Sequence, residues 1–262
     1  MSARRAISSV SRTRRRRLLA IQSAGRGVSA VSNSTTLGLA SELSTSPERQ
    51  SAYDQVREYL RGTTPRTWLF VGDCLGFAPH IVRRSYIEYF NDMLRTRLNR
   101  AADAVVDITI TDSSLLKLRD QMPSRLLRFR PDVVFCMPGL QDVATAVAGR
   151  ESFEGALHDL VATTAEHGCQ LVLAAPPLLL AAEKDEFSDL PAYVDILRRV
   201  AEQRGLLLVD HWKYWELARE TRDIDEWVDV SCTRLLHEGH RRASQLLLRT
   251  LGVLIAAKRT PR

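Results

Sequence analysis

The chain has 262 residues, of which 45% are hydrophobic, so it can bury a substantial core as one α/β domain with an appendage. Its net charge of +6 comes from one end, because the first 41 residues hold eight arginines and no acidic residue, whereas the remainder carries 29 basic and 31 acidic residues. Charge alone therefore gives no reason to expect specific nucleic-acid binding by the folded part. No apolar run reaches the roughly 18 residues that a membrane span needs.

Residues 1–45 are rich in arginine and serine and have little apolar periodicity, which predicts a disordered arm. The same composition has two further interpretations: a targeting segment, or an arm that binds phosphates or anionic lipids. The four cysteines are far apart and form no C-x-x-C pair, which argues against a zinc site and a disulfide framework. We therefore expect reduced thiols, a cytoplasmic protein, no metal and no cofactor.

Residues 46–65 are predicted to form a lead-in helix and a linker, with Pro47 in the first turn and Gly62 as the stop. The folded domain is predicted to span residues 66–256, and residues 257–262 to form a basic tail. Apolar runs predict strands at 67–72, 104–110, 132–139, 170–177 and 206–210. Amphipathic runs predict helices at 84–99, 114–128, 151–167, 191–204 and 237–254.

The predicted strands are almost continuously apolar, as expected when helices cover both faces of a sheet. We therefore predict an α/β fold with three layers, a doubly wound, five-stranded parallel sheet in the flavodoxin-like order 2-1-3-4-5. In such a sheet the ligand crevice lies beyond the carboxyl ends of strands one, two and three. The turns that follow those strands contain Cys74, Asp112 and Gln141. These turns contain neither G-x-G-x-x-G nor G-x-x-x-x-G-K-[ST], the two glycine-rich motifs that bind the phosphates of nucleotides.

Several blocks resemble the SGNH (GDSL) hydrolase family of esterases and acylhydrolases, over about residues 66–252. The blocks are "VGDCL" at 71–75, "PDVVFCMPGLQD" at 131–142 and "HEGHRRASQLL" at 237–247, in the family's order and spacing. The resemblance implies a serine nucleophile on the first turn. It further implies an oxyanion hole completed by a glycine after strand two and an asparagine after strand three, and an Asp-x-x-His pair before the last helix.

At the family's catalytic positions this chain carries other residues. Cys74 takes the place of the serine, Asp112 (or Thr111) that of the glycine, and Gln141 that of the asparagine. Counting back from Gly239 places Ser231 at the acid position and Arg234 at the base position. A slip of two or three residues offers His237 as the base instead, or pairs Asp229 with Cys232.

These replacements remove the chemistry of a serine esterase. A cysteine at the turn is still a nucleophile, but an arginine cannot accept its proton near neutral pH. A carboxylate at position 112 would repel a developing oxyanion. We expect Asp112 and Arg234 to form an ion pair across the former active site, together with Asp73, since a buried charge needs a partner.

Three functions are compatible with these residues. The first is a pseudoenzyme or catalytically impaired protein of esterase ancestry that works as a binding or interaction module. The second is an active ester hydrolase with Cys74 as an unconventional nucleophile and His237 as its base. The third is a ligand-binding module in which Arg234 holds the carboxylate or phosphate of a small anionic or ester-like ligand.

Other polar and aromatic residues have structural interpretations. We expect Cys136 to be an apolar core residue, Asp210 to cap the segment after the last strand, and Gln141 with Asp142 to tie down a turn. The aromatic residues at 211–215 have helical spacing, which favours packing over a substrate wall. His237 and His240 are expected to cap or line the first turn of the last helix.

Overall fold

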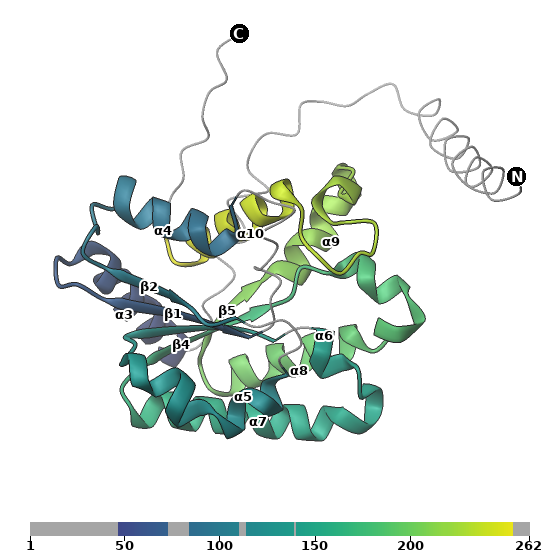
Figure 1. Ribbon diagram of the computed structural model, residues 1–262, viewed down its shortest axis with the longest axis horizontal. Helices are drawn as coiled ribbons and strands as arrows, with labels where there is room; N and C mark the ends of the chain where they lie inside the picture. The colour runs from purple at the N-terminus through teal and green to yellow at the C-terminus, as the bar shows by residue number, and fades with distance from the viewer. Residues whose placement is uncertain (1–46, 73–83, 110–113, 139, 254–262) are drawn as a thin grey trace, which may run out of the picture. The chain divides into compact units, whose positions relative to one another are not determined.

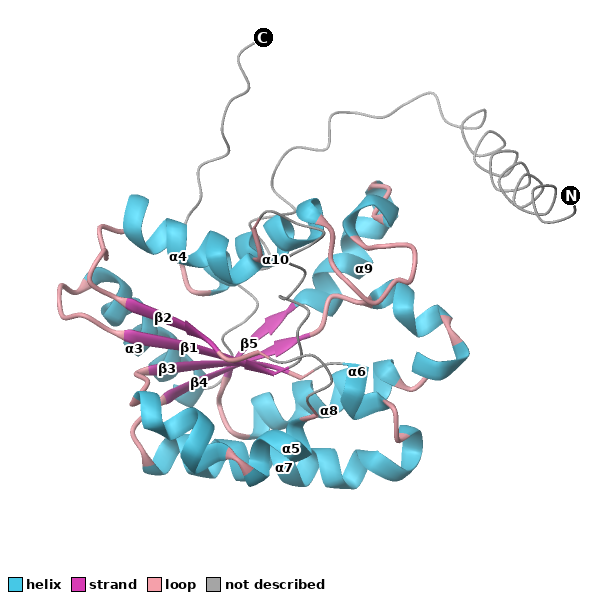
Figure 2. Ribbon diagram, in the orientation of Figure 1, coloured by secondary structure: helices cyan, strands magenta, loops and turns pink. Residues whose placement is uncertain are grey.

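The computed structural model describes residues 47–72, 84–109, 114–138 and 140–253. The predicted arm of residues 1–45 and the tail of residues 257–262 lie outside these ranges. Strands and helices alternate along the described chain (Figure 2). The strands are β1 (Thr67–Gly72), β2 (Ala104–Asp107), β3 (Val133–Met137), β4 (Gln170–Ala175) and β5 (Leu207–Asp210). The α-helices are α3 (Pro47–Arg61), α4 (Tyr86–Thr96), α5 (Leu115–Asp120), α6 (Leu140–Val143), α7 (Ala146–Glu166), α8 (Leu190–Gln203), α9 (His211–Thr221) and α10 (His237–Thr250).

The described strands form one parallel sheet in the order β2-β1-β3-β4-β5, which confirms the predicted topology. Helices cover both of its faces (Figure 1), with α4 and α10 packed together on one face and α5, α7 and α8 on the other. The order in which strands are added to the sheet reverses between β1 and β3, so these two strands end beside the predicted crevice.

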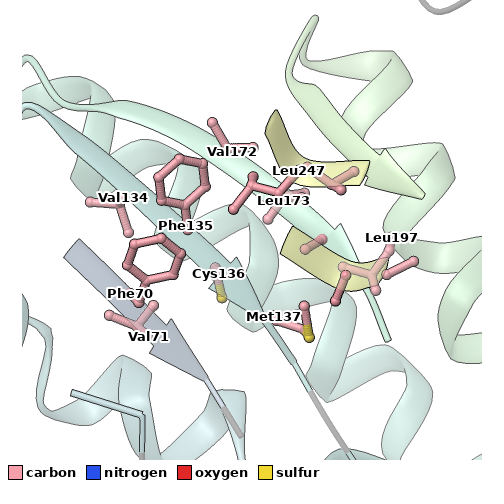
Figure 3. Packing of buried hydrophobic residues seen from close by; sticks show 14 of the residues in the cluster. Phe70, Val71, Val134, Phe135, Cys136, Met137, Val172, Leu173, Leu197 and Leu247 are labelled. Carbon is pink, nitrogen blue, oxygen red and sulfur yellow. The ribbon is translucent and has the colours of Figure 1, made fainter. Parts of the chain in front are cut away.

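Aromatic side chains fill the core beneath α4. Phe70 of β1 and Phe135 of β3 lie side by side with ring centroids 4.6 Å apart (Figure 3), and Phe90 of α4 packs edge-on against both. Every residue of β3 is buried, as the continuous apolar run predicted. Cys136 belongs to this strand and is 0% exposed, which confirms it as a core residue.

Local sequence signals explain several helix starts. Ser85 caps α4 in a capping box with Glu88, in which each side chain accepts a hydrogen bond from the other residue's backbone. Asp210 caps α9 by accepting a hydrogen bond from the backbone N–H of Lys213 at 2.9 Å, as expected. The lead-in helix α3 begins at Pro47 and ends at Arg61, before the predicted stop at Gly62.

Some predicted boundaries were wrong. Strand β2 ends at Asp107 and not at residue 110, because the Asp107 carboxylate accepts hydrogen bonds from both the N–H and the hydroxyl of Thr109 and turns the chain. The helix predicted for 114–128 divides into α5, a short π-helix (Met122–Leu126) and a 3-10 helix (Leu127–Phe129), because Pro123 interrupts the regular α-helical hydrogen bonds. Helix α7 starts at Ala146, five residues earlier than predicted.

Helix α9 is absent from the predicted elements. The spacing of its aromatic residues predicts packing, and the structure agrees, because His211, Trp212 and Trp215 are all buried. Trp215 packs edge-on against Trp227 with ring centroids 5.2 Å apart, which ties α9 to the 3-10 helix η6 (Asp225–Trp227).

Candidate functional site

Strands β1 and β3 approach each other closely at their carboxyl ends, where the sequence predicts the ligand crevice. Gly72 pairs in register with Met137, and a Cβ atom on Gly72 would lie 2.1 Å from the Met137 carbonyl oxygen. Gly72 also has φ +116°, which side-chain-bearing residues rarely adopt. The glycine of the "VGDCL" block is therefore required by the sheet itself, whatever chemistry follows it.

Two of the predicted site residues fall outside the described ranges. Cys74 lies within residues 73–83 and Asp112 within residues 110–113. The predicted ion pair of Asp112 with Arg234, and the contribution of Asp73 to it, therefore stay predictions. The remaining four predicted positions, Gln141, Ser231, Arg234 and His237, are described.

The turn after β3 is joined to the start of α5. Asp142 in α6 is buried, and its Oδ1 accepts a hydrogen bond from the backbone N–H of Leu115 at 2.6 Å. This bond brings the segment that follows strand two close to the segment that follows strand three, as a crevice at the switch point requires. Gln141, which the sequence resemblance assigns to the family's asparagine position, is exposed on the same short helix. We expected Gln141 and Asp142 to tie down a turn through local bonds, whereas this bond of Asp142 reaches a residue 27 positions away in the chain.

Ser231 and Arg234 lie on one tight turn, residues 229–234, which we call the 229–234 turn. An antiparallel bridge between Val228 and Leu235 closes it, and the backbone N–H of Asp229 donates to the Arg234 carbonyl at 3.0 Å. Cys232 takes a left-handed conformation with φ +55° inside the turn. The turn leads directly into α10, so Ser231 and Arg234, which the sequence resemblance assigns to the family's acid and base positions, lie shortly before the last helix.

Asp229 organises this turn. Its carboxylate accepts hydrogen bonds from the Ser231 hydroxyl, at 2.7 and 2.8 Å, and from the backbone N–H groups of Thr233 and Arg234, at 3.2 and 3.3 Å. The sequence had suggested Asp229 only as a partner of Cys232. The spacing Asp-x-Ser-x-Thr was the available signal, because such residues bond locally to backbone groups in turns.

The side chains at the family's acid and base positions face different surroundings. The Ser231 hydroxyl is engaged by Asp229 and by Thr233 Oγ1, and the Ser231 carbonyl accepts a hydrogen bond from the Lys184 ammonium group. The Arg234 side chain is exposed, and its guanidinium makes no hydrogen bond or ion pair with any residue in the described ranges. A serine hydroxyl and a guanidinium differ chemically from the carboxylate and imidazole that the family resemblance implies at these positions.

His237, the alternative base, is the first residue of α10 and is exposed. Its ring nitrogens both lie 3.4 Å from the Tyr89 hydroxyl of α4, and the two ring centroids are 6.1 Å apart. Burial raises the pKa of Tyr89. His237 is thus held by α4, and no carboxylate of the described chain makes a hydrogen bond or ion pair with its ring.

His240 has a structural role that the sequence did not reveal. It is 0% exposed, stacks on Tyr86, and its Nδ1 accepts a hydrogen bond from the Tyr86 backbone N–H at 3.3 Å. Desolvation lowers the pKa of this imidazole to about 4, with a further contribution from His237. It therefore links α10 to the start of α4 as a neutral side chain and does not cap its own helix.

The described residues contain no group of three or more histidine, cysteine or acidic side chains that could hold a metal ion. Within the same ranges, no helix combines the length and the apolar composition that crossing a membrane requires.

Solved structures with this fold include several esterases. LAE5, an alpha/beta hydrolase enzyme from the metagenome of Lake Arreo in Spain, has a TM-score of 0.65 and 20% identity over 75% of this chain and 100% of its own. Axe2, an acetylxylan esterase from Geobacillus stearothermophilus, has a TM-score of 0.65 and 19% identity over 76% of this chain and 100% of its own. The acetyl xylan esterase AlAXEase has a TM-score of 0.59 and 19% identity over 70% of this chain and 98% of its own. A search of curated proteins gave no match.

Identities this low establish the fold and not the activity of the chain. A family model, in contrast, matches residues 70–242, which span the sheet, the 229–234 turn and the first part of α10. This match agrees with the sequence motifs, with the strand order and with the position of the turn. The chain therefore belongs to the GDSL-like lipase/acylhydrolase family.

Proposed function

We propose that this chain is a catalytically impaired member of its family, which uses the crevice at the carboxyl ends of β1, β2 and β3 to bind a small ligand. The observation that carries the proposal is the 229–234 turn. At the two positions where the family places a carboxylate and an imidazole, it presents Ser231, whose hydroxyl is held by Asp229, and an exposed Arg234.

Loss of the acid and base has a large effect on rate. A nucleophile at position 74 would need a neighbouring group that accepts its proton and later protonates the leaving group. Removing a complete triad reduces turnover by roughly 10⁶-fold in a serine hydrolase. Gln141 and Asp112 further alter the positions that would stabilise an oxyanion. Binding without turnover is the function that these side chains can still support.

The test is an ester-hydrolysis panel with acetyl and longer acyl p-nitrophenyl esters. The wild-type chain is compared with a variant that restores all family residues: Cys74→Ser, Asp112→Gly, Gln141→Asn, Ser231→Asp and Arg234→His. We expect no turnover by the wild-type chain and measurable turnover by the restored one. The matched control carries the other four substitutions and keeps Arg234, and it should stay inactive because it lacks the base.

The second candidate is an active esterase with Cys74 as nucleophile and His237 as base. It is favoured by the fixed contact of His237 with Tyr89, which orients an imidazole at the start of α10. This candidate predicts wild-type turnover that is abolished both by Cys74→Ala and by His237→Gln. Turnover with that pattern of loss would overturn the proposed binding function.

A further inference from the structure

We propose that the end of the sheet at which β1, β2 and β3 begin is a docking surface for an anionic lipid membrane. We call this surface the arginine end and define it by the segments 57–66, 95–104 and 125–133, which lead into the three strands. The ligand crevice is predicted at the other end of the same strands. The inference therefore goes beyond the proposed function and does not depend on it.

Positive charge is concentrated in these three segments. They hold nine arginines and three acidic residues, whereas the rest of residues 42–262 holds 20 basic and 28 acidic residues. The arginine end thus carries a charge of +6 and the remainder of that range −8. A basic residue at a helix C-terminus is common, because it interacts favourably with the helix dipole. That effect explains one arginine at the end of α3 or α4, but not three arginines in each segment.

Polar contacts hold the three segments together. Strand β1 lies between β2 and β3, and all three run in the same direction (Figure 1). Arg100, before β2, donates hydrogen bonds to the carbonyls of Gly62 and Thr64, before β1. Arg66, also before β1, forms an ion pair with Asp132, directly before β3, at 2.7 Å. The segments therefore form one continuous surface.

Most of the acidic side chains at the arginine end are engaged internally, which leaves the exposed charge positive. Asp103 is buried against Arg100, and Asp132 binds Arg66. Glu58 is exposed on α3 and offsets one positive charge. Five exposed arginines of these segments form no ion pair with an acidic residue in the described ranges: Arg61, Arg95, Arg97, Arg128 and Arg130.

The aromatic residues of the arginine end favour a lipid surface over a nucleic acid. Single-stranded nucleic acids stack their bases on accessible aromatic rings, and duplexes are read by an element that enters a groove. The two rings in these segments, Tyr59 and Phe129, are half-buried, and a guanidinium lies over each, 4.0 Å from the Tyr59 centroid and 4.6 Å from the Phe129 centroid. Separate arginines spread over one end of a domain suit a broad layer of anionic headgroups.

The experiment measures binding of the full chain to sedimenting vesicles of phosphatidylcholine, alone or mixed with an equal amount of phosphatidylserine. We expect binding only to the mixed vesicles, and weaker binding at high salt because exposed charges are screened. Arg97→Gln combined with Arg130→Gln should weaken binding roughly 25-fold, about fivefold for each arginine. The matched control combines Lys213→Gln with Arg222→Gln, which removes the same charge from exposed positions at α9, beyond the carboxyl end of β5. The control should bind almost as the wild-type chain does.

Urea titration checks that each double variant folds, and a second pair, Arg61→Gln with Arg95→Gln, should show a similar loss of binding. No binding of the wild-type chain to the mixed vesicles would overturn the proposal. Equal affinities of the wild-type chain and both arginine-end variants, or equal losses in these variants and the control, would also overturn it. So would tighter binding to a random-sequence DNA duplex that depends on the same arginines. None of these results affects the hydrolysis panel, which decides the proposed function.

Discussion

Arg100 and Asp103 form a buried ion pair beside the amino-terminal ends of β1 and β2, the opposite end of these strands from the candidate site, with both side chains only 2% exposed. Arg100 Nε and Nη2 lie 2.7 and 2.8 Å from the two Asp103 oxygens. The same carboxylate accepts a hydrogen bond from the indole N–H of Trp68 at 2.6 Å, and Arg100 donates to the carbonyl of Thr64 at 2.7 Å. The pair therefore anchors the linker after α3 to the sheet.

Removing one member of this pair should strongly destabilise the protein. In Arg100→Met the Asp103 charge stays buried without its main partner, and we expect the free energy of unfolding to fall by about 3–5 kcal/mol in urea titrations. The control is Arg84→Gln, which breaks the exposed pair with Asp92, whose side chains are 53% and 47% exposed. That change should cost less than about 1 kcal/mol. Equal effects of the two substitutions would contradict the anchoring role.

Gly72 provides a second test of the fold beneath the site. An alanine there places Cβ against the Met137 carbonyl at φ +116°, so Gly72→Ala should lower the free energy of unfolding by at least about 3 kcal/mol. Gly155 lies exposed within α7, and a Cβ atom there has nothing within 4 Å. Gly155→Ala should instead raise stability by about 0.5–1 kcal/mol. Chemical denaturation measures the change in unfolding free energy for both variants. A small loss of stability in Gly72→Ala would argue against the close approach of position 72 to the Met137 carbonyl.

The strands could be predicted because each is a short apolar run, and their order followed from the doubly wound fold class that the alternation of strands and helices indicates. Buried strands of a parallel sheet are continuous apolar runs, and the "VVFCM" run became a strand that is buried throughout. The elements that the sequence misplaced depend on less regular patterns. Helix α9 mixes buried aromatic with exposed charged residues, and the early start of α7 includes exposed Val147 and buried Gly149, which do not form a simple apolar stripe.

The candidate site was predictable in position and less so in its contacts. Counting from Gly239 placed Ser231 and Arg234 before the last helix, and both lie on the 229–234 turn. The Asp-x-Ser-x-Thr spacing is a signal for local bonds made by Asp229, but it does not reveal the left-handed conformation of Cys232 within the turn. The bond between His240 and Tyr86 joins residues far apart in the chain, which a single sequence does not reveal.

Acid should destabilise the protein through two buried histidines. Desolvation lowers the pKa of His240 and of His211 to about 4, whereas an unfolded histidine titrates near 6.5. Below that higher value the unfolded state binds more protons, so stability is complete above about pH 6.5 and falls as the pH drops toward 4. Between pH 7.5 and 5 each histidine should cost roughly 2 kcal/mol of unfolding free energy.

Urea titrations of His240→Asn across this pH range measure how much His240 contributes to the loss of stability. An asparagine oxygen can still accept a hydrogen bond from the Tyr86 N–H but does not gain a proton. The loss of stability between pH 7.5 and 5 should shrink by roughly 2 kcal/mol relative to the wild-type chain. His167→Asn, at an exposed position, should leave the pH profile unchanged. An identical profile in all three proteins would contradict the prediction.

The cysteines should differ sharply in reactivity. Burial raises the pKa of the Cys136 thiol, which is 0% exposed, and also that of Cys169, which is 7% exposed. Cys232 is partly exposed on the 229–234 turn. Iodoacetamide should therefore modify Cys232 in the native protein well before Cys136, since alkylation needs an accessible thiolate.

Peptide mass spectrometry over time gives the modification rate at each site, and unfolding in urea should equalise the rates. Faster modification of Cys136 than of Cys232 in the native chain would contradict the described packing. The result also guides the esterase test, because alkylation at Cys232 must be separated from alkylation at Cys74. A Cys232→Ser background provides that separation.

The order of the 229–234 turn should depend on Asp229 more than on Ser231. Asp229→Ala removes the acceptor of the Ser231 hydroxyl and of two backbone N–H groups, and should cost about 1–3 kcal/mol of unfolding free energy. Ser231→Ala removes only the hydroxyl donor and should cost about 0.5–1.5 kcal/mol. Adding Ser231→Ala to Asp229→Ala should cost less than Ser231→Ala costs in the wild-type chain, since the hydroxyl has then lost its carboxylate and keeps only its contact with Thr233 Oγ1. Urea titration of the two single variants and the double variant measures this coupling, and additive losses would show that the turn is held by other contacts.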